Sequence, residues 1–522
     1  MKSTNFLLFC LVAIIFISCQ NTPSPTNEAT PLADSTSTFF QEPHRPQFHF
    51  SPKANWMNDP NGMVYYDGEY HLFFQYYPED IVWGPMHWGH AVSKDLVHWE
   101  HLPIALYPDS LGYIFSGSAV IDWKNTSGLG ENNQPPMIAI FTHHDPKGER
   151  AQRKDFQYQS ITYSNDKGRT WTKYKGNPVL SNPGIKDFRD PKVIWHEATQ
   201  QWVMVLAVYD RAHFYTSPNL KDWTFASEFG IKGDTRLWEC PDLFPMKVEE
   251  SGATKWVLIT SIQKEGPNGG TATAYFVGDF DGKIFTGDPA KQYWADYGTD
   301  NYAMVTWSDV PGEDGRRLAL GWMSNWQYAQ EVPTEKWRSA MTLTRALSLH
   351  QNGDNFQLCS LPVKELKTIE GPAQTINQKK YTNTTLLLQS PTPLQHKITL
   401  RFTPSPNAIA GLRFSNTAGE KFDLLFNTKA KRYEMDRRAI GQAFNEHFQA
   451  KHFGEASYEL KERKMLVYID HSSIELFGDD GRCVMTDLFF AQQPLTTIEL
   501  LVEQGELEVL AGGIISLRGI WD

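Results

Sequence analysis

Short apolar runs separated by turn residues fill the chain between about residues 48 and 349. Met63–Tyr66 and Tyr70–Tyr76 flank an Asp67-Gly68 turn, which is the pattern of a β-hairpin. No long stretch with the 3.6-residue period of a helix interrupts these runs. The pattern therefore predicts an all-β region built from small antiparallel sheets.

A weak repeat indicates how these sheets are arranged. A Ser-x-Asp or Ser-x-Asn turn is followed by Trp four or five residues later in three places. The copies are Ser93-Lys94-Asp95 with Trp99, Ser164-Asn165-Asp166 with Trp171, and Ser217-Pro218-Asn219 with Trp223. Similar hairpins reused around one axis are typical of a β-propeller, although these copies are unevenly spaced.

After about residue 365 the pattern changes to short runs of partly alternating apolar and polar residues. These runs lie at 384–388, 396–402, 411–414, 422–426, 432–435, 465–469 and 473–477. Such a series predicts a β-sandwich. A chain of 522 residues is also too long to fold around a single hydrophobic core, which favours two domains. We predict a propeller at 44–350, a linker at 351–365 containing a turn at 351–354, and a sandwich at 366–522.

The N-terminus has the pattern of an export signal. Lys2 precedes an apolar run from Phe6 to Ile17, and Ser18-Cys19 follows. This resembles a bacterial lipoprotein signal at 1–18 with Cys19 as the lipidated residue; ordinary cleavage is the alternative. Residues 19–43 are mostly polar and predict a flexible tether. We expect a protein of the bacterial cell envelope that meets a membrane only through the lipid on Cys19.

Composition narrows the classes of function. The net charge of −11 argues against a nucleic-acid partner. Seventeen Trp, 21 Tyr and 31 Phe supply many rings for cores and for stacking surfaces. Beyond the signal, Cys240, Cys359 and Cys483 are too few and too widely spaced for a disulfide framework or a zinc site. We predict no metal and no cofactor, and the oligomeric state stays open.

The segment from Trp56 to Gly62 is the first candidate for chemistry. Asn61-Gly62 and Pro60 are turn formers, so a hairpin turn explains the second half of the segment. A turn does not require Trp56 or Asn58. A carboxylate such as Asp59 among amides and beside an aromatic ring suits a sugar, whose hydroxyls need polar partners and whose ring needs a platform.

Two further acidic motifs precede apolar runs. They are Arg189-Asp190-Pro191 and Trp238-Glu239-Cys240-Pro241. Seen alone, Asp-Pro commonly begins a turn and an Arg-Asp pair is often only surface charge. Glu239 stands between two apolar residues, a setting that suits a general acid if the side chain is buried.

Together the three motifs resemble the signature motifs of glycoside hydrolase family 32, which contains invertases, inulinases, levanases and other β-fructofuranosidases. Further blocks that are similar to the family include Gly321–Trp326, Trp337–Thr342 and Ile469–Phe477. The resemblance implies an all-β fold, with a five-bladed propeller that carries the site in its axial funnel and a C-terminal β-sandwich.

The resemblance also implies roles. Asp59 would be the nucleophile, Glu239 the acid/base, and Asp190 a transition-state stabiliser kept ionised by Arg189. A retaining reaction would need the Asp59 and Glu239 carboxyls about 5 Å apart. The expected substrate-binding residues are Asn58, Asn61, Gln75, Trp83, Phe115, Ser116, Arg189 and either Trp326 or Trp322, with Trp326 favoured.

The implied function is exo-acting release of fructose from fructans (inulin or levan) and from sucrose. An endo-acting levanase or inulinase on the same fold is the first alternative, and a fructosyltransferase is a weaker one. From another class, the protein could be a surface fructan-binding protein without catalysis. The sequence leaves the preference between β-2,1 and β-2,6 linkages open.

Overall fold

The computed structural model describes residues 39–521. Within this range the chain forms 35 strands, one five-residue helix, α1 (Pro146–Arg150), and one 3₁₀ helix, η1 (Lys364–Ile369). No helix in the described range is long and apolar enough to cross a membrane. The predicted signal, the lipidation site Cys19 and most of the predicted tether lie outside the described residues.

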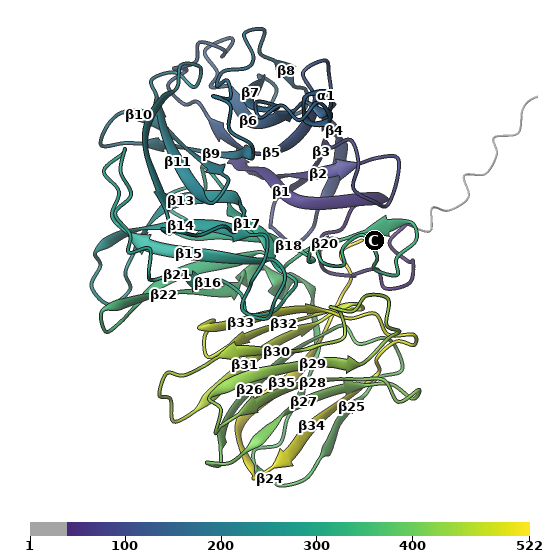
Figure 1. The fold of residues 1–522 in the computed structure, drawn as a ribbon. Coiled ribbons are helices and arrows are strands. Elements are labelled where there is room, and N and C mark those ends of the chain that lie inside the picture. Colours follow the sequence, from purple (N-terminus) through teal and green to yellow (C-terminus); the bar gives the residue numbers. More distant parts are fainter. Residues whose placement is uncertain (1–38, 522) are drawn as a thin grey trace, which may run out of the picture. The chain divides into compact units, whose positions relative to one another are not determined.

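Five antiparallel sheets follow one another along the first part of the chain (Figure 1). The first contains β1 (Asn55–Tyr66), β2 (Glu69–Tyr77), β3 (His87–Ser93) and β4 (Glu100–Leu106). The second contains β5 (Tyr113–Ile121), β6 (Met137–His144), β7 (Gln157–Ser164) and β8 (Thr172–Lys173). The third contains β9 (Phe188–His196), β10 (Gln201–Val208), β11 (Arg211–Ser217) and β12 (Thr224–Gly230).

The remaining two sheets have the same order of strands. The fourth contains β13 (Trp238–Lys247), β14 (Thr254–Ile262), β15 (Ala272–Gly278) and β16 (Tyr293–Trp294). The fifth contains β17 (Tyr302–Thr306), β18 (Arg317–Met323), β21 (Arg345–Asn352) and β22 (Asn355–Pro362), with β20 (Ala340–Met341) beside β18.

The first strands of the five sheets surround one axis. Strands β1, β5, β9, β13 and β17 contact one another in that order, and β17 contacts β1 again. The short strand β19 (Trp337–Arg338), which follows β18 in sequence, closes the circle by pairing in parallel with β1 at Asn55 and Trp56. The predicted propeller is confirmed, and each sheet is one blade.

The sequence repeat belongs to the first three blades. Ser93, Ser164 and Ser217 are the last residues of β3, β7 and β11, the third strand of each blade. Each hydroxyl accepts a hydrogen bond from the backbone N–H two residues later, at 3.2, 3.3 and 3.1 Å. The motif therefore turns the chain from the third strand of a blade towards the fourth.

Both predicted edges of the propeller need adjustment. The turn at 351–354 joins β21 to β22, so most of the stretch predicted as a linker is the outer strand of the fifth blade. At the other edge, the tether was predicted to reach residue 43. Phe40 instead stacks on Trp521 with ring centroids 4.1 Å apart, and Glu42 pairs with buried Arg45.

Two sheets form the C-terminal β-sandwich. One contains β23 (Glu370–Thr375), β35 (Leu507–Leu517), β26 (His396–Pro404), β31 (Arg463–Ile469), β32 (Ser473–Gly478) and β33 (Cys483–Leu488), with β24 (Lys380–Tyr381) beside β35. The other contains β25 (Thr385–Gln389), β34 (Thr497–Gln504), β27 (Ile409–Ser415), β28 (Lys421–Asn427), β29 (Arg432–Ala439) and β30 (Lys451–Glu455). Phe402, Leu412 and Ile498 belong to the core that both sheets enclose.

A buried group of charged residues joins the fifth blade to the sandwich. Arg345 on β21 donates to Asp296 Oδ2 at 2.9 Å and to Glu475 Oε2 on β32 at 2.7 Å. His49, near the start of the propeller, contacts Asp470 at 2.8 Å and Glu475 at 2.9 Å. We call these five residues the junction cluster.

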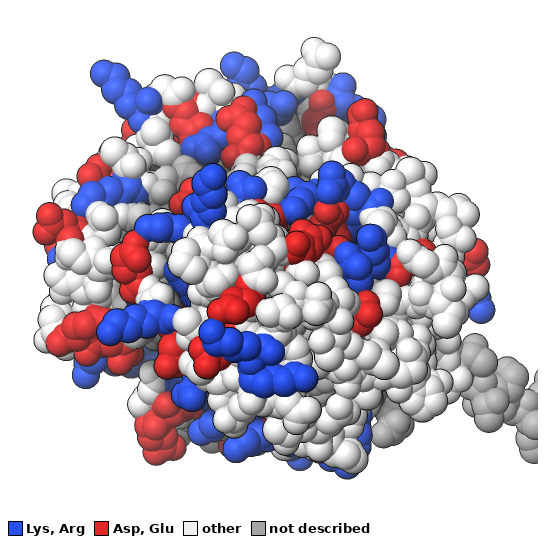
Figure 2. All heavy atoms as spheres, turned by 90° about the horizontal axis from the view of Figure 1, so that it is seen from below, with Lys and Arg blue, Asp and Glu red and all other residues white. Residues whose placement is uncertain are grey.

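Charges of both signs are mixed on the face that is seen from below Figure 1. Lys and Arg alternate there with Asp and Glu, and no large area of one sign is visible among the described residues of this face (Figure 2). A nucleic-acid partner would favour a continuous basic surface. This face therefore carries both signs of charge without a continuous basic surface in the part that the structure describes (Figure 2).

Candidate active site

All five innermost strands have an irregular register near their first residues. The shifts lie at Met57–Pro60 and Asn61–Val64 in β1, at Ile114–Gly117 in β5, at Arg189–Lys192 in β9, at Glu239–Asp242 in β13 and at Tyr302–Val305 in β17. Bulges re-aim side chains that a regular strand would bury. The irregular residues thus lie at one end of the propeller axis.

Backbone conformation supports this arrangement. Asp190, Cys240 and Gly62 have φ values of +64°, +44° and +52°. A Cβ atom on Gly62 would lie 2.6 Å from the Phe73 ring, so a larger residue would not fit there. Non-glycine residues with positive φ are uncommon and concentrate at functional sites.

A cavity of about 290 Å³ lies at this end of the axis. Ten of the residues predicted for catalysis or substrate binding line it. They are Asn58, Asp59, Gln75, Trp83, Phe115, Ser116, Arg189, Asp190, Glu239 and Trp326. The structure thus gathers side chains from positions 58 to 326 in one pocket, which we call the catalytic pocket.

Asp59 accepts hydrogen bonds at both carboxylate oxygens. Ser116 Oγ donates to Oδ2 at 2.6 Å, and Asn58 Nδ2 donates to Oδ1 at 3.0 Å. The Cys240 thiol lies 3.3 Å from Oδ2, and burial raises the pKa of this thiol well above its usual range, so it stays protonated and donates. Burial also raises the pKa of Asp59, and the nearby Glu239 adds to this shift. The donors hold the carboxylate in one orientation.

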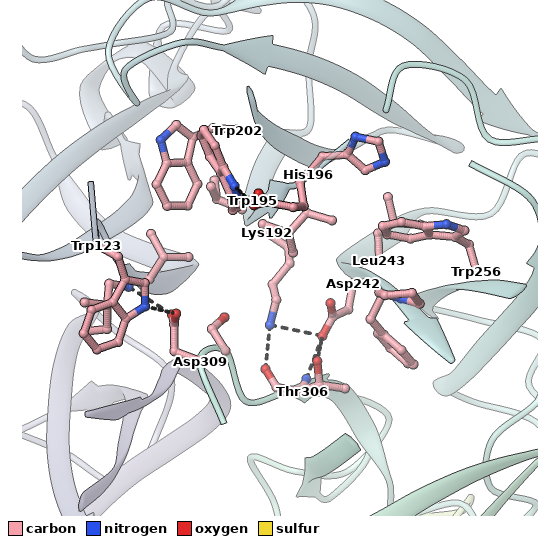
Figure 3. A pocket seen from close by; sticks show the side chains of 18 of the residues that line it. Trp123, Lys192, Trp195, His196, Trp202, Asp242, Leu243, Trp256, Thr306 and Asp309 are labelled. Atoms are coloured by element: carbon pink, nitrogen blue, oxygen red, sulfur yellow. Dashed lines mark hydrogen bonds and ion pairs between the residues drawn. The ribbon is translucent and has the colours of Figure 1, made fainter. Parts of the chain in front are cut away.

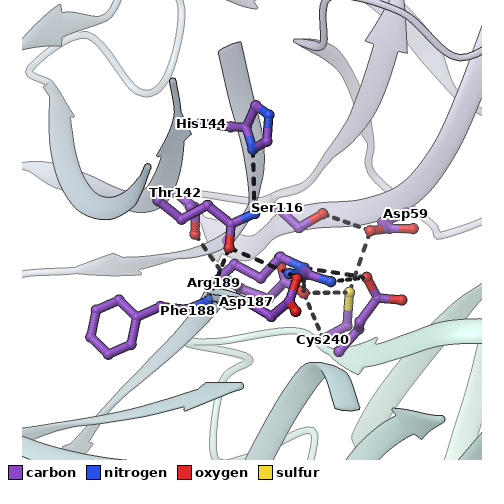
Figure 4. A network of polar contacts seen from close by, with 12 residues as sticks. Asp59, Ser116, Thr142, His144, Asp187, Phe188, Arg189 and Cys240 are labelled. Atoms are coloured by element: carbon purple, nitrogen blue, oxygen red, sulfur yellow. Dashed lines mark hydrogen bonds and ion pairs between the residues drawn. The ribbon is translucent and has the colours of Figure 1, made fainter. Parts of the chain in front are cut away.

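Glu239 is held by a cation and a phenol. Arg189 Nη2 donates to Oε1 at 2.9 Å, and Tyr302 Oη donates to Oε2 at 2.5 Å. Arg189 Nη1 donates to Asp187 at 2.7 Å (Figure 4). The apolar setting suggested by the sequence neighbours of Glu239 is therefore replaced by two polar partners from β9 and β17.

Asp190 differs from the prediction. Arg189 directs its guanidinium to Glu239 and Asp187, and its Nε lies 3.9 Å from Asp190 Oδ2. Burial raises the pKa of Asp190 to about 7; Arg189 opposes the shift, whereas Glu239 and Asp59 add to it. Arg189 thus favours the ionised form of Asp190, as expected, but compensates for burial only in part. The Cys240 backbone N–H, 3.0 Å away, is a closer donor.

Some groups on the pocket wall have no partner in the protein. Gln75 is buried, and among the described residues its Nε2 has no hydrogen-bond acceptor. Asn58 accepts a bond from Trp56 Nε1 at 2.7 Å, which fixes its amide. A buried donor without a partner is costly, and a ligand hydroxyl in the pocket could satisfy it.

Aromatic rings form the rest of the wall. Phe115 stacks on His144 with centroids 4.2 Å apart and meets Trp83 edge to face at 6.0 Å. Trp83 is 37% exposed, unlike most Trp residues of the chain. Trp326 lines the cavity, whereas Trp322 is fully buried behind it, so the structure favours the first of the two alternatives.

Asn61 is the predicted binding residue that the structure does not bring to this pocket. It is fully buried, its Nδ2 donates to the Asp59 carbonyl at 3.0 Å, and its Oδ1 accepts from Gly117 N at 3.1 Å. The amide nitrogen thus braces β1 itself, and the amide oxygen joins β1 to β5. Asn61 therefore supports the turn that carries Asp59 and does not face a ligand.

Sequence reasoning missed several pocket residues. They are His144, Glu149, Phe156, Gln157, Asp187, Gln263 and Gln330 in the wall, and Tyr302 behind Glu239. The position of Asp187 three residues before Asp190 is a local signal that could have been noticed; the others depend on contacts between distant segments.

Comparison with known proteins agrees with this geometry. The model of the "Glycosyl hydrolases family 32 N-terminal domain" matches residues 49–362, and that of the C-terminal domain matches residues 365–515. The chain belongs to glycosyl hydrolase family 32. It is therefore a glycoside hydrolase, and the two matched regions coincide with the propeller and the sandwich of this family 32 protein.

Individual relatives span most of the chain. A levanase of Bacillus subtilis is 48% identical over 93% of this chain and 72% of its own length. An extracellular exo-inulinase of Aspergillus awamori is 36% identical over 92% of this chain and 96% of its own length. The crystal structure of the Aspergillus awamori exo-inulinase superposes with a TM-score of 0.83 at 35% identity and covers 92% of this chain and 100% of that one.

Proposed function

We propose that this family 32 protein is an exo-acting, retaining β-fructosidase that releases fructose from fructans and sucrose. The observation that carries the proposal is the placement of Asp59, Asp190 and Glu239 in one pocket whose other walls are aromatic and amide groups. The printed activities of the similar proteins, levanase and exo-inulinase, support fructans as substrates.

The proposed reaction has two steps. Asp59 attacks C2 of the fructosyl unit while Glu239 gives its proton to the departing glycosidic oxygen, which leaves as an alcohol. Water then attacks C2 of the fructosyl-Asp59 ester, Glu239 takes the proton of this water, and Asp59 is released. Two displacements at one carbon return the original configuration.

The neighbours of each carboxylate have defined parts in this reaction. Ser116 and Asn58 orient the attacking oxygens of Asp59. Arg189 and Tyr302 hold the carboxyl of Glu239 near the leaving oxygen. Asp190 and the free Nε2 of Gln75 would bind hydroxyls of the fructosyl ring, so that charge developing at C2 meets preorganised polar groups.

The size of the pocket supports exo action. Its volume of about 290 Å³ lies at the lower end of the range for small-ligand pockets, about 300–1,000 Å³. Such a space suits a terminal sugar better than the middle of a chain. An endo-acting levanase or inulinase remains the second candidate, because a "levanbiose-producing levanase" of Bacillus subtilis is 34% identical to the chain.

Product analysis tests the proposal. The protein is incubated with sucrose, inulin and levan, and the products are separated by chromatography. We expect fructose as the only early product from both polymers. A ladder of oligosaccharides would instead establish endo action, transfer of fructose to longer chains would indicate a fructosyltransferase, and no product would favour a non-catalytic fructan-binding protein.

We also propose lipid attachment at Cys19 in the bacterial envelope, which rests on the sequence of the N-terminal segment alone. Labelling with a radioactive fatty acid should mark the wild-type protein and should fail for Cys19→Ala. The variant should move to the soluble fraction. Equal labelling of both proteins would reject Cys19 as the attachment point.

A further inference from the structure

A second cavity, of about 600 Å³, lies at the opposite end of the innermost strands (Figure 3). Strand β9 runs from Asp190 in the catalytic pocket to Trp195 and His196 in this cavity, and β13 runs from Glu239 to Phe244. We call it the distal pocket. No residue of the catalytic pocket lines it.

The two pockets are separated along the axis. Lys192 Nζ donates to the Thr306 carbonyl at 2.5 Å and lies 3.2 Å from Asp242 Oδ2. Thr306 donates to the same carboxylate oxygen through its backbone N–H at 2.6 Å and its hydroxyl at 2.8 Å. A hollow of about 20 Å³ lies on the catalytic side of this group. A molecule in the distal pocket therefore cannot reach the catalytic carboxylates.

Four indole rings line the distal pocket: Trp123, Trp195, Trp202 and Trp256. In Figure 3 they surround Lys192 on several sides. Three of these rings are held in place: Trp123 donates to Asp309 at 2.8 Å, Trp202 donates to Thr126 at 2.8 Å, and Trp195 packs edge to face on Trp202 at 5.1 Å. Trp123 is 60% exposed, an unusual environment for a Trp side chain.

Polar groups in the lining have unused capacity. Asp242 is completely buried, and within residues 39–521 its Oδ1 has no hydrogen-bond partner; the same holds for Ser308 Oγ. Among the residues that the structure describes, the Arg317 side chain makes a single long hydrogen bond, 3.5 Å from Nη1 to the Trp307 carbonyl, and its guanidinium lies over Phe244. The lining holds three cations, Lys124, Lys192 and Arg317, and three carboxylates, Glu197, Asp242 and Asp309, so its formal charges balance.

We propose that the distal pocket is a second carbohydrate-binding site that takes a short neutral oligosaccharide. Flat indoles suit the C–H faces of sugar rings, and the mixture of unused donors and acceptors suits hydroxyls, which both give and receive hydrogen bonds. The balanced charges favour a ligand without net charge. The volume lies within the range of small-ligand pockets, about 300–1,000 Å³.

This site would hold a sugar chain or released product apart from the catalytic pocket. Its existence does not depend on turnover, so it is tested in Asp59→Ala, which should bind sugars without consuming them. Isothermal titration with 1-kestose should give two bound molecules per chain. One molecule per chain, held in the catalytic pocket, would overturn the proposal and leave the proposed function intact.

Variants then assign the second molecule. Adding Trp123→Ala or Arg317→Met to Asp59→Ala should weaken one of the two binding events at least 10-fold and leave the other unchanged. Trp223→Ala, which removes a partly exposed indole outside the pocket, is the matched control and should keep both. Circular dichroism confirms that each variant is folded. Two unchanged binding events in both pocket variants would contradict the assignment.

Discussion

Two groups of buried carboxylates can be compared in this molecule: Asp59, Asp190 and Glu239 in the catalytic pocket, and Asp296, Asp470 and Glu475 in the junction cluster. In the pocket, burial raises the pKa of Asp59 and raises that of Asp190 to about 7. At the junction, burial acts in the same direction but is outweighed, and the pKa values of Asp470 and Glu475 are lowered.

The difference comes from the partners. Burial raises the pKa of Glu475, but Arg345 and His49 lower it by more. His49 likewise outweighs the effect of burial on the pKa of Asp470. Backbone N–H groups of Gln47 and Leu343 donate to the same carboxylates. In the pocket, the single cation Arg189 also serves Asp187 and leaves Asp190 with weak compensation. Burial with several partners therefore gives a stable joint in one place, and burial with few partners gives a reactive, incompletely satisfied site in the other.

The largest effect is expected from removing a carboxylate of the catalytic pocket. Glu239→Ala should lower kcat about 10²- to 10⁴-fold, because the leaving oxygen loses its proton donor. Asp59→Ala should lower kcat at least as much, since no covalent intermediate can form. Initial rates on sucrose and thermal unfolding curves check this. Near-normal turnover in either variant, with an unchanged melting curve, would reject the assigned roles.

The next largest effect is expected from removing the cation of the junction cluster. Arg345→Met removes the buried cation that Asp296 and Glu475 share and leaves His49 as the cationic partner of Glu475, so the free energy of unfolding should fall by about 3–5 kcal/mol. Urea denaturation measures the change. The rate per folded molecule should stay within a factor of about two, because Arg345 does not line the catalytic pocket. A loss of activity without a loss of stability would contradict the division between the two clusters.

The junction should also make stability depend on pH. Although burial opposes protonation, hydrogen bonds to Asp470 and Glu475 raise the pKa of His49 from 6.5 to about 9. A raised pKa contributes stability that is fully present below pH 6.5 and is lost as pH rises through about 9, by about 3 kcal/mol. Urea midpoints at several pH values test this, and His49→Gln should flatten the curve. A wild-type midpoint that rises over this window would contradict the sign.

A smaller effect is expected from removing the Gln75 amide, whose nitrogen has no partner among the described residues of the pocket wall. Gln75→Ala should lower kcat/KM about 5-fold, because a hydrogen bond to a fructosyl hydroxyl contributes on the order of 1 kcal/mol. Asn61→Ala is the contrasting variant. It removes the hydrogen bond between Asn61 in β1 and Gly117 in β5, so it should lower the free energy of unfolding and should change kcat/KM less than Gln75→Ala does. Unchanged kcat/KM in Gln75→Ala would remove that residue from the binding site.

Local sequence patterns predicted much of the fold and of the site. The Ser-x-Asp turns followed by Trp predicted repeated blades because each turn ends an equivalent strand. The three acidic motifs could be found because each is compact and sits at the start of an innermost strand. The resemblance to family 32 supplied the number of blades and the roles, which composition and spacing did not.

What the sequence did not reveal depends on contacts between distant segments. Arg189 is next to Asp190 in the chain but reaches Glu239, fifty positions later, because β9 and β13 are adjacent. Tyr302 meets Glu239 for the same kind of reason. Asn61 belongs to the motif, yet its amide is consumed by β1 and β5. Residues 355–362 looked like a linker because an outer strand carries a weak apolar pattern.

The central claim is that Asp59 captures the fructosyl group before water releases it. The most direct test is transfer to methanol: the protein is incubated with sucrose and methanol, and the products are identified by carbon NMR. The account predicts methyl β-D-fructofuranoside beside fructose, with both products lost in Asp59→Asn. Formation of the α-anomer, or hydrolysis that continues in Asp59→Asn, would contradict it.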